Sequence, residues 1–284
     1  MTSAEPTLRW LEANARGLAV AIEDVSESLA AVALQGPASR AILQRLADID
    51  LTELKFFRLT AARLSGIPVT VSRTGYTGDL GYELWVAAGD AVALWDALIA
   101  AGDPYGITPA GMLALDVARI EAGLMLIDVD YVPARKALIA AQASSPFELD
   151  LKWAVDLSKD DFVGARALAK EALRAPQWQF VGLDLEWEAL ERLYGEVGLA
   201  PQLPGVAWRS STPAYASGRQ VGYATSGCWS PLLKKYIALA HLESAWASPG
   251  TTVELEVTVE HRRKRAAARV VKKPFFNPER KRAA

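Results

Sequence analysis

A carboxylate and an indole stand close together directly after a glycine-rich turn. Glu83 and Trp85 alternate with apolar residues at the end of the stretch Val69–Val86, which is the period of a strand with two different faces. An ionised carboxylate can accept two parallel N–H bonds, so Glu83 suits a flat heterocycle that carries an amino group beside a ring N–H. The alternative is an ordinary hairpin in which Glu83 faces water.

The residues around this pair predict the hairpin that positions it. Val69 and Val71 alternate with polar residues before the turn, and Tyr82, Leu84 and Val86 share one face after it. Glycine serves where the backbone needs a positive φ or where a ligand approaches closely. The turn contains Gly75, Gly78 and Gly81.

A second candidate side chain, Arg119, lies on a predicted helix. Thr108 and Pro109 suit the cap and first turn of that helix. Its apolar face is predicted to hold Leu113, Val117, Ile120 and Leu124. Arg119 lies off that face, near Asp116 on the preceding turn. Taken by itself, this spacing predicts a surface ion pair worth a few tenths of a kcal/mol.

Other segments predict the remaining framework. Leu18–Val25 and Leu29–Leu34 read as strands, and Asp90 is placed to cap a helix that ends at Gly102. That helix is expected to bury Leu94, Trp95 and Leu98. After a boundary near residue 174, short alternating strands separated by Pro and Gly indicate a small antiparallel barrel or sandwich. Two of these strands contain Val181, Leu183 and Leu185, and Val253, Leu255, Val257 and Val259.

Five motifs then resemble one known family, in the family's order. S-R-T-G-Y-T-G-D-L-G-Y-E (Ser72–Glu83) is similar to the signature of the aminomethyltransferases, the T-protein of the glycine cleavage system and its folate-dependent relatives. An ordered set of five motifs is far more specific than one glycine pattern. The other four are L-A-L-D-V-A-R-I-E-A-G (Leu113–Gly123), D-D-F-V-G (Asp160–Gly164), T-S-G-C-W-S-P-L-L-K-K (Thr225–Lys235) and V-V-K-K-P-F (Val270–Phe275).

The resemblance implies a fold and a set of binding residues. It implies an α+β class, with mixed or antiparallel sheets and helices over residues 1–174 (a break near 64) and a small antiparallel β-barrel over residues 175–284. Glu83 would hold the pterin amino edge of tetrahydrofolate, Tyr76 would line the ring pocket, and Arg119 would hold an anionic or polar part of the cofactor. Trp153 matches a position where the family tends to have tryptophan, and it is either a platform or core. No catalytic residue is assigned.

The resemblance also implies a reaction and partners. The family's folate nitrogen attacks an aminomethyl group on a lipoyl carrier, and this needs close placement and a proton route. Val129–Pro146 departs from the family's short acidic loop, which leaves a folate-dependent S- or O-demethylase as an alternative. A homodimer and a separately encoded N-terminal chain are further possible partners.

The start of the chain leaves a third alternative open. Family members carry roughly a hundred further residues, a domain-sized portion, ahead of the matched part. That portion includes an aspartate regarded as central to catalysis, and no D-D-x-x-V-Y-like segment precedes Val32. A truncated gene model, an upstream start or a split protein would each explain this, and the chain as given is expected to have little activity. A non-catalytic folate-binding or interaction protein is therefore the third hypothesis.

Composition narrows the functional classes. The 284 residues are 51% hydrophobic with a net charge of −2, which suits a cored enzyme and gives no reason to expect nucleic acid. A single cysteine, Cys228, fits a reducing cytoplasm. Two histidines without ligand spacing indicate no metal site, and no apolar run is long enough to predict a membrane span. The basic segment 261–284 is either solvated or a contact for an anionic partner.

Overall fold

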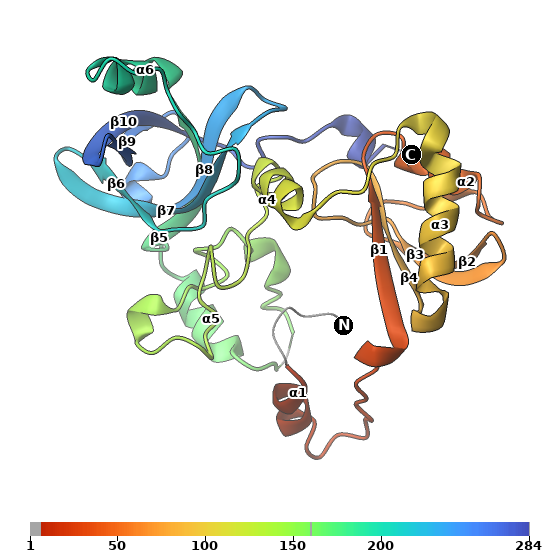
Figure 1. The fold of residues 1–284 in the computed structure, drawn as a ribbon. Helices are drawn as coiled ribbons and strands as arrows, with labels where there is room; N and C mark the ends of the chain where they lie inside the picture. Colours follow the sequence, from red (N-terminus) through yellow and green to blue (C-terminus); the bar gives the residue numbers. More distant parts are fainter. Residues whose placement is uncertain (1–6, 160, 284) are drawn as a thin grey trace. The chain divides into compact units, whose positions relative to one another are not determined.

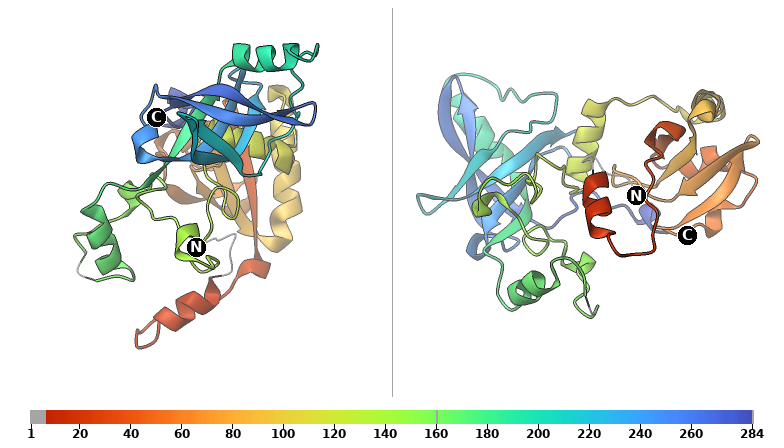
Figure 2. Two further views of the ribbon diagram at one scale, coloured as in Figure 1. Left: turned by 90° about the vertical axis from the view of Figure 1, so that its left-hand side faces the viewer. Right: turned by 90° about the horizontal axis from the view of Figure 1, so that it is seen from below.

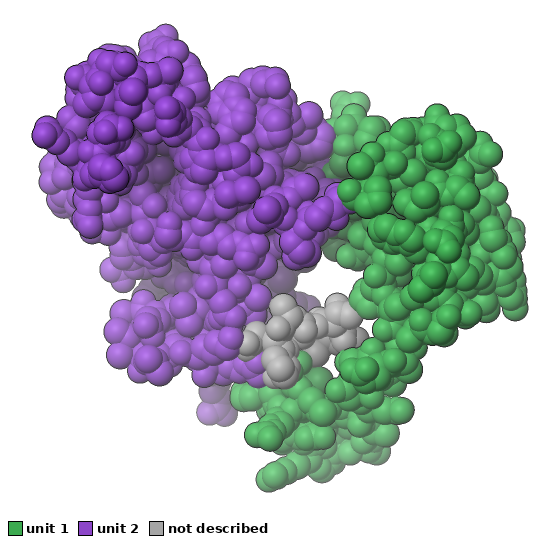
Figure 3. Space-filling view, viewed as in Figure 1, with its two compact units in different colours: residues 1–75, 79–109, 278–284 green, residues 76–78, 110–277 purple. Residues whose placement is uncertain are grey.

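The computed structural model describes residues 7–159 and 161–283 (Figure 1). The chain forms two compact units, coloured separately in Figure 3, and each is described by itself. Unit 1 contains residues 1–75, 79–109 and 278–284, and unit 2 contains residues 76–78 and 110–277. The domain boundaries predicted near residues 64 and 174 differ from the limits of these two units, and they stay a prediction.

Unit 1 is built on a four-stranded antiparallel sheet of order β1-β4-β3-β2 (Figure 1). Helices α2 and α3 contact β4 and β1, respectively, and each other. The core between helices and sheet is aliphatic, with Leu43, Leu84 and Leu94 fully buried. The elements are α1 (Leu8–Asn14), β1 (Leu29–Gln35), α2 (Ser39–Gln44), β2 (Leu59–Leu64), β3 (Ile67–Ser72), β4 (Gly81–Ala87), α3 (Ala91–Gly102) and the 3-10 helix η8 (Glu279–Lys281).

The predicted hairpin of β3 and β4 is present. Val69 lies opposite Val86, and Ser72 lies opposite Glu83. On β4, the residues Tyr82, Leu84 and Val86 are buried, whereas Glu83 is only half-buried on the other face with Trp85. The period of two in the sequence therefore gave the correct faces, because β4 has a helix-covered core on one side only.

Unit 2 contains a closed antiparallel barrel, seen from two further sides in Figure 2. Its six strands have the order β10-β5-β8-β7-β6-β9 and are labelled in Figure 1. Alternate residues of β5 and β9 fill it, including Leu183, Leu185, Val253 and Leu255, as the alternation predicted. Helix α4 packs against β7 and β8. The elements are α4 (Met112–Glu121), the 3-10 helix η6 (Lys152–Ala154), α5 (Ala165–Ala172), β5 (Trp178–Leu185), α6 (Trp187–Gly195), β6 (Thr212–Ala216), β7 (Arg219–Ser230), β8 (Lys235–Glu243), β9 (Thr252–Val259) and β10 (Arg262–Val271).

Helix α3 forms as predicted, but its buried face is narrower than expected. It begins after Asp90 and ends at Gly102, although the Asp90 side chain makes no capping hydrogen bond. Leu94 and Leu98 are buried, whereas Trp95 is 43% exposed. Trp95 follows Leu94 by about 100° around the helix axis, which turns it away from the sheet.

Helix α4 begins later than the Thr108–Pro109 signal indicated. Gly111 is extended at the helix N-terminus, so the helix cannot continue back through it and starts at Met112. Leu113 is 63% exposed, and the expected apolar face is correct only in the later part of the helix, where Val117 is half-buried and Ile120 is fully buried. Leu124 lies beyond the end of the helix. The part of α4 that faces the barrel is therefore its C-terminal half.

The predicted strand Leu18–Val25 is wrong. The segment is irregular, and its apolar residues are exposed. A strand needs a neighbour for its backbone hydrogen bonds, and β1 takes its pairing from β4.

Within the described residues, no helix combines the length and the apolar character needed to cross a bilayer.

Candidate functional site

Among the described residues, Glu83 has a hydrogen-bond partner on only one of its two carboxylate oxygens. Its Oε2 accepts a hydrogen bond from the Thr74 hydroxyl, and Thr74 is in turn 2.8 Å from the Ser72 hydroxyl. In the described part of the chain, no group donates to Oε1. Glu83 is thus oriented by the strand end that precedes the glycine turn, and it retains the capacity to accept a donor from a ligand.

Two of the turn glycines leave room for the end of the Gln35 side chain. A Cβ added at Gly75 or at Gly81 would lie 2.0 Å from Oε1 of Gln35. The Gln35 amide bridges the turn by donating to the carbonyls of Thr74 and Tyr82, at 3.3 and 3.2 Å. Gly78 differs, because its φ of +79° favours glycine directly. Close ligand approach is therefore not required to explain these glycines.

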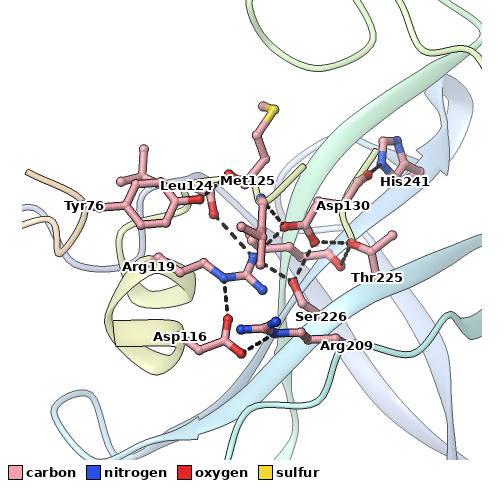
Figure 4. Close-up of polar contacts among 12 residues, drawn as sticks. Tyr76, Asp116, Arg119, Leu124, Met125, Asp130, Arg209, Thr225, Ser226 and His241 are labelled. Carbon is pink, nitrogen blue, oxygen red and sulfur yellow. Dashed lines mark hydrogen bonds and ion pairs between the residues drawn. The ribbon is translucent and has the colours of Figure 1, made fainter. Parts of the chain in front are cut away.

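The second candidate, Arg119, lies in a buried polar network between α4 and the barrel (Figure 4). Its side chain is 1% exposed. Nε donates to Asp116 at 2.8 Å, and Nη1 donates to Asp130 at 2.5 Å and to the Ser226 hydroxyl at 3.1 Å. The surface-pair interpretation of Arg119 and Asp116 is therefore wrong, since both are buried.

The network balances its charges. Asp116 also accepts from Arg209 Nε at 2.7 Å, so two guanidinium groups face two carboxylates. Asp130 accepts from the hydroxyls of Thr225 and Ser226 and from the backbone N–H of Leu126. Buried charges persist when they are paired and hydrogen-bonded in this way.

One nitrogen of the Arg119 guanidinium has no hydrogen-bond acceptor among the described residues. Its Nη2 is buried and has no hydrogen-bond partner in the described protein. A buried guanidinium N–H without an acceptor is costly, so an acceptor group of a ligand or solvent is expected at this atom. Arg119 can thus hold an anionic or carbonyl group while its other nitrogens stay on the protein.

Tyr76 lies next to this network. Its hydroxyl donates to the Met125 carbonyl, one residue after Leu124, whose carbonyl is 3.4 Å from Arg119 Nη1. Burial raises the pKa of Tyr76 to about 12, and the Arg119 charge opposes that shift. Tyr76 is therefore a neutral phenol at physiological pH, and the structure brings it together with Arg119.

His241 contacts the network through the backbone of Asp130. Its Nε2 is 2.6 Å from the Asp130 carbonyl, and its ring lies between Tyr223 and Phe180, with centroids 5.4 and 5.1 Å away. Burial lowers the pKa of His241 despite the neighbouring carbonyl. The neutral imidazole therefore donates Nε2–H to the carbonyl.

Trp153 is separate from the network. It lies in η6 and is 79% exposed, so the core interpretation of this tryptophan is wrong and a platform role stays a prediction. Glu83 belongs to unit 1, whereas Tyr76, Arg119 and Trp153 belong to unit 2. Among the four predicted binding residues, the structure joins Tyr76 to Arg119.

Sequence reasoning missed several network residues. Thr225 and Ser226 open the T-S-G motif, which carried the resemblance without a role. Asp130 lies inside the stretch 129–146 that departs from the family pattern, so no motif drew attention to it. Arg209 had no signal at all. In the D-D-F-V-G motif, Asp160 lies outside the described residues.

Comparisons with known proteins agree with the fold. Residues 1–159 match the GCVT N-terminal domain, and residues 196–277 match the glycine cleavage T-protein C-terminal barrel domain. The aminomethyltransferase of Shouchella clausii is 36% identical over 271 residues, 95% of this chain and 65% of that protein. The aminomethyltransferase of Bacillus pumilus is 34% identical over 97% of this chain and 68% of that protein.

A solved structure is similar over nearly the whole chain. The glycine cleavage system aminomethyltransferase T from Bartonella henselae superposes with a TM-score of 0.74 and 27% identity, covering 96% of this chain and 66% of that chain. The chain thus spans about 65% of the length of the first relative it matches. With a family domain matched over more than half of its residues, the chain belongs to the glycine cleavage T-protein, or aminomethyltransferase, family.

Proposed function

We propose that this chain serves tetrahydrofolate-dependent aminomethyl transfer, with the aminomethyl group delivered on a lipoyl carrier protein. The observation that carries the proposal is Glu83, a half-buried carboxylate on the same face of β4 as Trp85, with one oxygen that accepts no donor from the described residues. The family membership supplies the reaction class, and relatives of the chain are named aminomethyltransferases.

Two residues, one in each unit, each fit a chemical group of tetrahydrofolate. Glu83 can accept an N–H from the amino edge of the pterin ring, because Oε1 is open while Oε2 stays on Thr74. In unit 2, taken by itself, Arg119 can donate its remaining Nη2–H to a carbonyl or carboxylate group of a ligand. When bound, tetrahydrofolate supplies the nitrogen that takes up the one-carbon unit.

The chain's own contribution is binding and orientation. Thr74 fixes the direction of the Glu83 carboxylate, and two carboxylates fix the Arg119 guanidinium. Preset groups of this kind lower the entropic cost of reaching a reactive geometry. Tyr76, kept neutral by its raised pKa, offers a ring surface and no negative charge beside the ligand. A cytoplasmic location is part of the proposal, since the single cysteine calls for no oxidising compartment.

The decisive experiment compares tetrahydrofolate binding in Glu83→Gln and Glu53→Gln by titration calorimetry. Glutamine at position 83 leaves one acceptor and sets an N–H donor against the donors of the ring. We expect affinity to fall about ten- to a hundred-fold, the equivalent of about 1.5–3 kcal/mol. Glu53 is an exposed carboxylate of unit 1, and its substitution controls for the loss of a charge. Equal affinity in all three proteins would reject Glu83 as the recognition group.

A second assay decides the donor. Purified protein is mixed with tetrahydrofolate and either an aminomethyl-loaded lipoyl carrier or S-methyl and O-methyl compounds, and one-carbon transfer to folate is followed. Transfer from the lipoyl carrier supports the proposal. Transfer from a methyl compound alone would replace it by a demethylase, and folate binding without transfer from any donor would replace it by a binding protein.

A further inference from the structure

We propose that Asp130 is the positioning residue of this site: it locks the Arg119 guanidinium in one orientation so that Nη2 is the donor left for the ligand. The inference rests on the proposed function for the identity of that ligand, a folate, but not for the lock itself. It concerns a residue in the segment 129–146, which the sequence comparison had set aside as a departure.

The first step is the geometry of the guanidinium. Its donors lie in one plane, and a single carboxylate would leave the group free to swing about that contact. Here Asp116 takes Nε at 2.8 Å and Asp130 takes Nη1 at 2.5 Å, so two different edges are held. Nη1 also contacts Ser226 and the Leu124 carbonyl. Only Nη2 remains without a partner in the described protein.

The second step is how Asp130 is itself held. Oδ1 accepts from the hydroxyls of Thr225 and Ser226, and Oδ2 accepts from the Leu126 N–H and from Arg119. Neighbouring residues of a regular strand point to opposite faces. The pairing of β7 with β8 shifts register on either side of Thr225, and such a bulge can turn adjacent side chains to one side. Both hydroxyls therefore reach one oxygen.

The third step is the backbone of Asp130. Its carbonyl accepts from His241 on β8 at 2.6 Å, while its side chain is bound to β7. Residue 130 lies in an irregular segment, yet it is tied to two adjacent barrel strands. The barrel thus sets the position of Asp130, and Asp130 sets the position of Arg119.

Asp116 does not duplicate this function. It lies on α4 with Arg119, three residues earlier, and shares its carboxylate with Arg209. It therefore moves with the helix that carries Arg119, and its contact outside that helix is the half-exposed side chain of Arg209. Asp130 adds a charged link from Arg119 to the barrel, beside the neutral contact of Nη1 with Ser226 on β7.

The test compares Asp130→Asn with Asp128→Asn, a matched change in an exposed pair with Lys136. Nitrogen NMR of the arginine side chains reports guanidinium rotation without any ligand. We expect slow rotation, with separate Nη signals for Arg119, in the wild type and Asp128→Asn, and fast rotation with merged signals in Asp130→Asn. Unchanged rotation in a folded Asp130→Asn protein would overturn the proposal. A merely stabilising role would lower the melting temperature without changing this signal.

Folate titration of the same proteins tests the consequence. We expect Asp130→Asn to weaken tetrahydrofolate binding about tenfold or more, and to add almost nothing in an Arg119→Gln background, because it acts through that side chain. A full additive loss in the double variant would overturn the proposal. If the wild type binds no folate while the rotation result holds, the proposed function fails and the lock stands.

Thr225→Val keeps the test falsifiable if Asp130→Asn does not fold. It removes one of the hydroxyl contacts of Asp130 and leaves every charge in place. We then expect faster Arg119 rotation and a loss of folate affinity of a few-fold. Rotation in Thr225→Val that matches the wild type would contradict the proposed path from barrel to Asp130 to Arg119.

Discussion

Two arginines of this chain are equally buried but have different partners. Arg73 in unit 1 and Arg119 in unit 2 are each 1% exposed, and each lies in a motif shared with the family. Arg119 faces two carboxylates. Arg73 has no acid within ion-pair distance in the described residues, and it donates to the backbone carbonyls of Leu54, Arg280, Lys281 and Ala283.

The comparison shows that motif membership and burial do not define a role. Burial and the nearby Arg40 charge lower the pKa of Arg73, and its bonds join the segment before β2 to the end of η8. That is a clamp on a chain segment, made of neutral acceptors. Arg119 lies among opposed charges. Each arginine keeps one buried nitrogen without a partner in the described residues, Nε of Arg73 and Nη2 of Arg119, so an unpaired donor does not distinguish them. The kind of partner, and not the presence of a buried arginine, therefore distinguishes a structural contact from a candidate binding site.

The largest expected effect is on stability, from Arg119→Met. Removing this cation leaves Asp116 with Arg209 but leaves Asp130 as an unpaired buried carboxylate. Breaking a buried ion pair from one side costs about 3–5 kcal/mol. Urea unfolding followed by tryptophan fluorescence should show this loss. A cost below about 1 kcal/mol would mean that the network does not carry its charges as drawn in Figure 4.

Arg73→Met is the matched change in unit 1 and should cost less. It leaves backbone carbonyls without donors but no buried charge without a counter-charge, and it removes the cost of burying a cation. The expected loss is about 1–3 kcal/mol, with tetrahydrofolate affinity unchanged. The same urea series and titration measure both quantities. A folate affinity that falls as steeply as in Arg119→Met would erase the distinction between the two arginines.

How much of this contrast the sequence predicts depends on the range of the interactions. The hairpin and the strands β5 and β9 follow from local alternation, and they are confirmed. The burial of Arg119 does not, because Ser226 is 107 residues away in the chain. Asp130 is only 11 residues away, but it lies in an irregular segment and its position is set by contacts with the barrel. The segment Leu18–Val25 fails for the converse reason, since its local pattern has no partner strand. The family resemblance supplied the fold class that local patterns alone left open.

A smaller effect should separate the two units by pH. Burial keeps the pKa of His241 below its ordinary value of about 6.5, so the folded imidazole stays neutral where the unfolded chain takes up a proton. Stability from this group is fully present above pH 6.5 and is lost as the pH falls towards the folded pKa, by at most about 1.4 kcal/mol per pH unit.

The control for this slope is His241→Gln, which removes the imidazole and keeps a polar side chain. Urea unfolding between pH 7 and pH 5 should show a shallower loss of stability in the variant than in the wild type. The two histidines of the sequence, His241 and His261, both lie in unit 2, so no histidine term is expected for unit 1. Parallel pH profiles in the two proteins would show that His241 does not titrate as inferred.

The smallest expected effect tests the clamp around Arg73 from its other end. Arg280, in η8, holds Asp79 through two contacts of 2.7 Å, and its side chain is 45% exposed. Such a pair is screened, so Arg280→Gln should cost at most about 1 kcal/mol, and less at high salt.

Arg73 and Arg280 hold the same segment of unit 1, one through carbonyls and one through Asp79. Once Arg73→Met has released the end of η8, the Asp79 contact has less structure left to stabilise. We therefore expect the double variant to cost less than the sum of the single changes, measured by urea unfolding at low and high salt. Strict additivity at both salt concentrations would mean that the two arginines act on independent segments, and that the contacts of Arg73 do not clamp η8.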